Sequence, residues 1–223
     1  MEKITGVMAG WLIMSANEAK KDYGFVVEDG KITEVVPNEK LMGKEGVLDA
    51  RENIIIPTFA CTHTHMYETI AHGAVEPNLS LKPLLEDFWW PVVENRQTLE
   101  TIRITAEYAS LEHLKTGVTL INDILEAPFA ENGKRLLTEE KVLRQAGIKG
   151  VLSLESNERI STENGEENLK ENADFILAMR ATGNNDIRGT ICTHTTFSCS
   201  VPFLKKAAGM ARDMDEIIQI HMN

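Results

Sequence analysis

The chain has 223 residues, of which 43% are hydrophobic and 26% are charged, so it can bury a core in one or two domains and does not have the composition of a disordered protein. Its net charge of −11 argues against a nucleic-acid partner, because phosphates repel an acidic surface, and leaves a small-molecule substrate open. No apolar run approaches the roughly 20 residues that cross a bilayer, so no membrane partner is expected. The three cysteines contain no CxxC pair, which favours a reducing, cytoplasmic location.

The first part of the chain predicts a small β unit without helices. Two β-rich runs within residues 24–36 flank Asp29-Gly30, a dipeptide typical of tight hairpin turns. Apolar residues at 10–14 and 47–56 predict further strands. We therefore expect a small antiparallel unit here.

From residue 53 onward, predicted strands alternate with predicted helices. Strands are expected for five runs: 53–63, 117–123, 148–155, 187–194 and 216–221. Helices are expected between them at 98–117, 136–146, 166–183 and 201–213, with Thr98 and Ser200 as N-caps. Such alternation indicates parallel strands joined by crossover helices, either in a doubly wound sheet or in a (β/α) barrel. No GxGxxG or GxxxxGK motif follows a strand, so a nucleotide-binding version has no support.

Ionisable residues stand at the carboxyl ends of the predicted strands, which is the edge where barrel enzymes do their chemistry. They are His63 and His65, Asp123, Glu155, His194 and His221. Each has a plainer interpretation, because a single histidine at a strand end is often a hydrogen-bonded structural residue. Glu155 could likewise form a surface pair of little energetic value with Arg159.

The pair His63 and His65 is the most specific functional signal in the sequence. Residues two apart on a strand point to the same face, so two imidazoles would converge near the strand end. Neutral imidazole is a good ligand for zinc, and a catalytic zinc usually has three protein ligands and one open position. His221 is the natural third ligand. The run 187–194 has no lysine that could bridge two ions as a carbamate, so we expect one divalent ion, zinc ahead of iron.

Several segments resemble the amidohydrolase superfamily. PTFACTHTHM (57–66) resembles the PGFxxxHxH signature that closes the first barrel strand, and TGVTLIND (116–123) resembles the second strand. GTICTHTTFSCS (189–200) is similar to the fourth strand, and EIIQIHMN (216–223) to the start of the HxxE strand. The branch with cytosine, guanine and S-adenosylhomocysteine deaminases and triazine chlorohydrolases is the most similar. LEDFWWPVVE (85–94) and LSLESNERISTENGEEN (152–168) look more like aminohydrolases linked to selenium metabolism.

The resemblance implies an α/β fold of the (β/α)8 TIM-barrel type. Residues 57–223 would supply about the first five β/α units, and residues 1–56 would be the N-terminal β segment of a composite small β-sandwich domain. The family's HxxE glutamate would fall one residue past Asn223, so we expect an N-terminal part of a longer enzyme or an incompletely defined sequence. Thr58 and His72 depart from the family's usual glycine and arginine.

The implied activity is metal-dependent hydrolysis of an amino- or halogen-substituted heterocycle, in which metal-activated water displaces ammonia or chloride. The resemblance assigns the metal to His63, His65 and His221, and substrate contact to His194. Candidates for the substrate pocket are Trp89, Trp90 and Glu155, although the tryptophans could instead pack between barrel and helix. Two alternatives remain: a binuclear cyclic-amide hydrolase, and a non-catalytic half-barrel that needs a partner chain. A homo-oligomer is compatible with the sequence.

Overall fold

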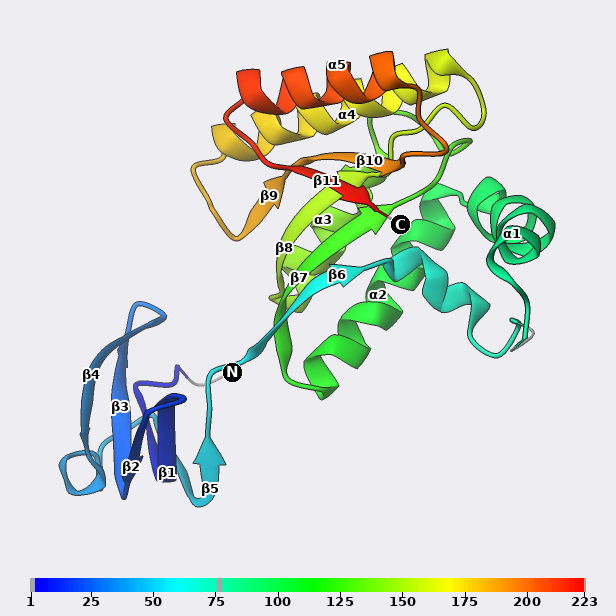
Figure 1. The fold of residues 1–223 in the computed structure, drawn as a ribbon. Coiled ribbons are helices and arrows are strands. Elements are labelled where there is room, and N and C mark those ends of the chain that lie inside the picture. The colour runs from blue at the N-terminus through cyan, green and yellow to red at the C-terminus, as the bar shows by residue number, and fades with distance from the viewer. Residues whose placement is uncertain (1–2, 76–77, 223) are drawn as a thin grey trace. The chain divides into compact units, whose positions relative to one another are not determined.

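The computed structural model describes residues 3–75 and 78–222 and divides the chain into two compact units, Met1–Thr58 and Phe59–Asn223 (Figure 1). Each unit has its own hydrophobic cluster. Among the described residues, no helix combines the length and apolar character needed to cross a bilayer.

The first unit is a single five-stranded sheet. Its strands are β1 (Gly6–Ser15), β2 (Glu18–Lys21), β3 (Tyr23–Glu28), β4 (Lys31–Pro37) and β5 (Val47–Ile55), with a 3-10 turn η1 (Asn38–Lys40). Strands β2, β1, β3 and β4 are antiparallel neighbours in that order. Asp29 (φ 48°) and Gly30 (φ 75°) are both left-handed, as the predicted hairpin turn between β3 and β4 requires. Strand β5 pairs with β1 in parallel, so the expectation of a wholly antiparallel unit was wrong.

The predicted strand 53–63 is two strands of different sheets. β5 ends at Ile55, and β6 (Phe59–Thr64) begins after Pro57. Proline lacks the N–H that a central strand must donate, and it restricts the residue before it, so a continuous ladder cannot pass through this point. The unit boundary between Thr58 and Phe59 therefore lies next to a proline break.

The second unit is built on parallel strands that follow one another in chain order. β6, β7 (Val118–Leu125), β8 (Lys149–Leu154) and β9 (Ile187–Gly189) form one sheet. β10 (Ile191–Thr195) and β11 (Ile218–His221) form a second parallel pair. A parallel bridge from Ser156 to Thr193 connects the two sheets. The predicted strand 187–194 is thus interrupted at Thr190, and the α/β class is confirmed.

Helices join the strands of this unit. After β6 come η2 (Met66–Ala71), the short α1 (Leu81–Pro83), the π-helical η3 (Leu84–Val93) and η4 (Glu94–Arg96). The crossover helices are α2 (Leu99–Lys115), α3 (Arg135–Ala146), α4 (Thr162–Ala181) and α5 (Val201–Asp213). α4 and α5 lie together along one side of β10, and α2 packs against α3 (Figure 1). The predicted caps are confirmed, because the side chains of Thr98 and Ser200 accept first-turn N–H groups.

Helix α4 begins four residues before its predicted start, with Ser161 as its N-cap. Gly165, which looks like a helix breaker, lies in its first turns. A Cβ at this position would come within 2.5 Å of the Asn157 carbonyl oxygen and 2.9 Å of Phe203 Cε2. Close packing therefore explains the glycine, and the helix runs through it.

The parallel strands curve strongly. In a flat sheet, three strand spacings of about 4.8 Å would separate β7 from β11 by about 14 Å. Instead, Asn122 on β7 and Gln219 on β11 exchange two hydrogen bonds of 2.6 Å and 3.0 Å. Side chains on the concave face therefore meet across it, and the carboxyl ends of β6 and β11 come together.

Candidate active site

Three histidine rings converge where β6 and β11 end. His63 lies on β6, His65 follows that strand directly, and His221 is the last residue of β11. The Nε2 atoms of His63 and His65 are 3.2 Å apart, and each lies 3.3 Å from Nε2 of His221. The three nitrogens form a nearly equilateral triangle, which we call the histidine triangle.

The other ring nitrogen fixes the tautomer of two of these rings. His65 Nδ1 lies 2.8 Å from the carbonyl oxygen of Ile124, and His221 Nδ1 lies 3.1 Å from that of His194. A carbonyl oxygen can only accept, so each Nδ1 carries the hydrogen and each neutral ring presents a lone pair at Nε2. Two lone pairs 3.3 Å apart repel each other unless a cation lies between them. The histidine triangle is therefore suited to a shared cation.

A tetrahedral zinc ion matches the size of the histidine triangle. With Zn–N bonds of about 2.0–2.1 Å, two nitrogen ligands are about 3.3–3.4 Å apart, close to the observed 3.2–3.3 Å. Three protein nitrogens would leave the fourth position open for water. Burial, with the neighbouring rings, lowers the pKa of His63, which favours the neutral form that a ligand needs.

Glu155 follows β8 and lies between two of the strand-end histidines. Its Oε1 atom is 2.8 Å from His221 Nδ1 and 3.9 Å from His194 Nε2. Burial opposes the charge, but the contact with His221 and the charges of the nearby histidines outweigh it and lower the pKa of Glu155. The same contact raises the pKa of His221, while burial lowers that of His194. A buried carboxylate thus stands beside one ring of the triangle and one ring outside it.

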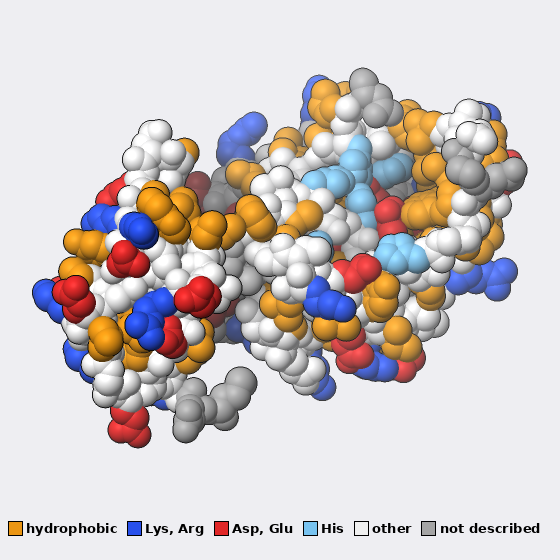
Figure 2. Space-filling model, turned by 90° about the horizontal axis from the view of Figure 1, so that it is seen from below, with side chains coloured by type: hydrophobic (Ala, Val, Ile, Leu, Met, Phe, Trp, Pro, Cys, Tyr) orange, Lys and Arg blue, Asp and Glu red, His pale blue; other side chains and the backbone are white. Residues whose placement is uncertain are grey.

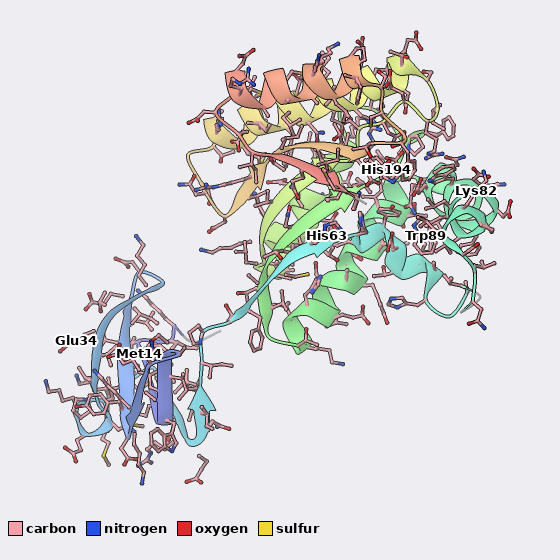
Figure 3. The ribbon with its side chains drawn as sticks, viewed as in Figure 1. Met14, Glu34, His63, Lys82, Trp89 and His194 are labelled. Atoms are coloured by element: carbon pink, nitrogen blue, oxygen red, sulfur yellow. The ribbon has the colours of Figure 1, made fainter. Side chains whose placement is uncertain are left out.

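A pocket of about 420 Å³ opens beside the histidine triangle, within the size range of small-molecule sites. One wall is apolar and includes Leu81, Leu84, Leu85, Trp89 and Phe197. The polar part of the lining includes His65, His194, His221 and the carboxylates of residues 68, 94 and 155. Figure 2 shows histidine and acidic side chains gathered in a hollow flanked by hydrophobic ones, and Figure 3 shows His63, His194 and Trp89 arriving from separate elements.

A buried ionic cluster supports the floor of this region. Arg159 lies 2.7 Å from Glu94 Oε2 and 3.3 Å from Glu126 Oε1, and its guanidinium carbon lies 5.0 Å from the ring centre of Trp90. Arg159 carries a single positive charge, so it cannot neutralise the three buried carboxylates of residues 94, 126 and 155. Burial raises the pKa of Glu94 to about 8 although Arg159 opposes it, and burial raises the pKa of Glu126 well above its ordinary value.

Comparison with known proteins places this site in a family. Residues 54–223 match the model described as "Amidohydrolase family". The chain belongs to the amidohydrolase family. A 5'-deoxyadenosine deaminase from Methanosarcina acetivorans is 30% identical over 197 residues, which is 88% of this chain and 43% of the relative. A 5-methylthioadenosine/S-adenosylhomocysteine deaminase from Carboxydothermus hydrogenoformans is 25% identical over 226 residues, covering 100% of this chain and 50% of the relative.

Solved structures share the fold of this amidohydrolase. An adenosine deaminase from Xanthomonas campestris, with bound zinc, superposes with a TM-score of 0.84 at 17% identity, covering 98% of this chain and 49% of that one. Guanine deaminase from C. acetobutylicum superposes with a TM-score of 0.80 at 19% identity, covering 97% and 52%. This chain therefore spans about half the length of the relatives that it matches.

The structure places the residues that the sequence singled out as follows. His63, His65 and His221 form the histidine triangle, and His194, Glu155 and Trp89 line the adjoining pocket. Trp90 does not line that pocket among the described residues, because its ring lies against Arg159. The interpretation of Glu155 and Arg159 as a surface pair was wrong, since Glu155 is buried and Arg159 binds two other carboxylates.

Sequence reasoning missed two acidic residues of the pocket of this amidohydrolase. Glu68 lies one helical turn past His65 and accepts a 2.9 Å hydrogen bond from Trp89 Nε1. Glu94 follows the apolar run FWWPVV, and Tyr67 donates to it at 3.4 Å. For Glu94, a carboxylate at the end of an apolar run was the available signal, but only the fold reveals that both residues line the pocket beside the histidine triangle.

Proposed function

We propose that this protein is a hydrolytic deaminase that removes the amino group from a flat, amino-substituted heterocycle and uses one divalent metal ion, zinc ahead of iron. The observation that carries the proposal is the histidine triangle. His63, His65 and His221 would hold the ion, which when bound would lower the pKa of a coordinated water and so supply the nucleophile at neutral pH. The family and its deaminase relatives support hydrolysis at a carbon–nitrogen bond.

The protein's own residues would bind and orient the substrate. The apolar wall with Trp89 suits the face of a planar ring, since aromatic side chains stack on such faces. Glu68 and Glu94 in the polar part of the lining can accept hydrogen bonds, so they would favour substrates that carry hydroxyl or amino donors over phosphates. Because relatives are named 5'-deoxyadenosine deaminase, adenosine-type nucleosides are the first substrates to test.

The same relatives favour deamination over dechlorination as the first proposal, because the structures named triazine hydrolase or atrazine chlorohydrolase resemble this chain in fold alone, at 16–19% identity. A two-metal enzyme would need a second site, for which Glu155, His194 and His221 are the possible ligands. This second site is disfavoured by the state of His221. The Nδ1 atom of His221 donates to a carbonyl and has no lone pair to offer there. We also propose that β6, β7, β8, the interrupted strand β9–β10 and β11 are the first five strands of a (β/α)8 barrel, with a small β domain in residues 1–56 and barrel residues from 57 onward. Their parallel order and strong curvature support this.

The experiment measures metal content and ammonia release together. Metal-free protein is loaded with zinc and assayed with 5'-deoxyadenosine, guanine and an aminated triazine, and a chlorinated triazine is assayed for chloride release. The expected result is one zinc per chain and ammonia from at least one substrate. His63→Ala should lose the zinc, whereas His72→Ala, an exposed histidine outside the triangle, should keep it.

Other outcomes select the other functions. Chloride release without ammonia would favour a chlorohydrolase, and two ions per chain would favour the binuclear enzyme. A chain that binds no zinc and elutes only with a partner would favour the non-catalytic half-barrel. Wild-type zinc content in His63→Ala would refute the assignment of the metal ligands.

A further inference from the structure

The loop after β10 holds the ring of His194 through hydroxyl groups. Ser198 Oγ lies 2.7 Å from His194 Nδ1 and 2.8 Å from Thr195 Oγ1. The backbone N–H of Thr195 donates to Ser198 Oγ at 3.3 Å, and that of Ser198 donates to Thr195 Oγ1 at 3.2 Å. The serine is therefore locked to the strand end by reciprocal bonds and cannot turn away from His194 without breaking them.

Counting hydrogens decides the direction of these bonds. If Thr195 donates to Ser198 and Ser198 donates to His194 Nδ1, every hydroxyl hydrogen of the three residues has an acceptor. If His194 Nδ1 instead donates to Ser198, the serine hydrogen can point to Thr195 Oγ1 or to Cys199 Sγ, 3.8 Å away. The first choice leaves the Thr195 hydroxyl without an acceptor among the described residues, and the second makes Ser198 Oγ accept three hydrogens with two lone pairs. Thr195 is buried, so an unpaired hydroxyl would be costly there. The first direction is favoured.

We propose that Ser198 is a positioning residue that holds neutral His194 with its hydrogen on Nε2. This inference rests on the proposed function for its catalytic consequence, while the tautomer itself can be measured without turnover. His194 Nε2 lies on the pocket side, 3.9 Å from Glu155 Oε1. An N–H there is a donor toward negative charge that develops on the substrate, and such preorganised donors stabilise a transition state.

The backbone of His194 is fixed as well. Its carbonyl oxygen accepts from His221 Nδ1 at 3.1 Å, and its N–H donates to the Ser156 carbonyl at 3.0 Å. With the main chain held at both groups, the ring hydrogen bond from Ser198 is the contact that selects between the two tautomers. Loss of the hydroxyl should therefore change the tautomer while the backbone stays in place.

The test reads the tautomer directly. Long-range 1H–15N correlation spectra of the full, zinc-loaded protein distinguish protonated from unprotonated ring nitrogens, and His194→Gln identifies the signals that belong to His194. We expect an unprotonated Nδ1 and a protonated Nε2 in the wild type. Ser198→Ala should give a mixture of tautomers, and Ser198→Thr should restore the wild-type pattern.

Kinetics and a matched control complete the test. Ser198→Ala should lower kcat about 10- to 100-fold with little change in KM, as loss of a partner that orients a functional histidine commonly does. Thr190→Val removes another buried hydroxyl, which donates 2.8 Å to Ile217 O, and should leave the His194 signals and kcat unchanged. A protonated Nδ1 in the wild type, or an unaltered tautomer in Ser198→Ala, would overturn the inference. If the tautomers behave as expected but no substrate is hydrolysed, the assignment of Ser198 stands and the proposed deaminase fails.

Discussion

Replacing Glu171 by alanine should destabilise the second unit severely. Glu171 on α4 lies 2.7 Å from the fully buried guanidinium of Arg135, and its two oxygens also accept the backbone N–H groups of Gly133 and Arg135 at 2.7 Å and 3.1 Å. Helix α3 has no side-chain cap of its own, so this carboxylate serves its N-terminus from a neighbouring helix. Leaving one partner of a buried ion pair alone costs about 3–5 kcal/mol. At about 2–4 °C per kcal/mol, Tm should fall by about 6–20 °C.

The assay is urea and thermal unfolding, with Glu166→Ala as the matched control. Glu166 lies on the same helix but pairs with Lys206 in a half-exposed bridge, which should contribute no more than about 1 kcal/mol. The double variant Arg135→Met with Glu171→Leu should recover much of the loss, because no uncompensated charge remains. A Glu171→Ala loss no greater than that of Glu166→Ala would refute this reasoning.

Three further predictions use the same unfolding assays. Gly189→Ala should cost about 1–3 kcal/mol, because its Cβ would lie 2.8 Å from Ile176 Cγ1, and a cost near zero would show that α4 can move away. Ser161→Ala removes the N-cap of α4 and should cost about 1 kcal/mol, which Ser161→Asp should avoid. Burial raises the pKa of Glu94 from 4.5 to about 8, so its contribution to stability is complete below its unfolded pKa and is lost as the pH rises toward 8. Glu94→Gln should flatten this decline, about 1.4 kcal/mol per pH unit at most, and equal slopes in both proteins would contradict the shifted pKa.

Local signals in the sequence predicted the elements whose ends are decided by neighbouring residues. The Asp29-Gly30 turn and the caps at Thr98 and Ser200 depend on contacts within four residues, so their chemistry is visible in the sequence. The parallel pairing of β5 with β1 joins residues about forty positions apart, and no local pattern encodes it. The need for a glycine at position 165 is hidden for a related reason, because the atoms that require it belong to segments outside its helix.

In the candidate site, too, the features set by local geometry could be predicted from the sequence, and those set by distant contacts could not. The spacing of His63 and His65 predicted that two imidazoles share a face, because strand geometry alone determines it. The burial of Glu94 and its contact with Arg159 could not be predicted, since they depend on how η4 lies against the segment after β8. The role of Ser198 was equally hidden, because a serine in a loop is an ordinary residue until its distance to a ring nitrogen is known.

Strand pairing helps to orient two rings of the histidine triangle. His65, from the β6 end, is held by a backbone carbonyl of β7, and His221 on β11 by a backbone carbonyl of β10. In each case the neighbouring strand in the sheet supplies the acceptor, so the pairing that builds the sheet also sets the tautomer that leaves Nε2 free. Backbone acceptors survive side-chain substitution, but His221 Nδ1 also lies 2.8 Å from Glu155 Oε1, so the orientation of that ring depends on a pocket carboxylate as well. His194 joins the two functions, since its carbonyl orients a ring of the triangle while its own ring faces the pocket.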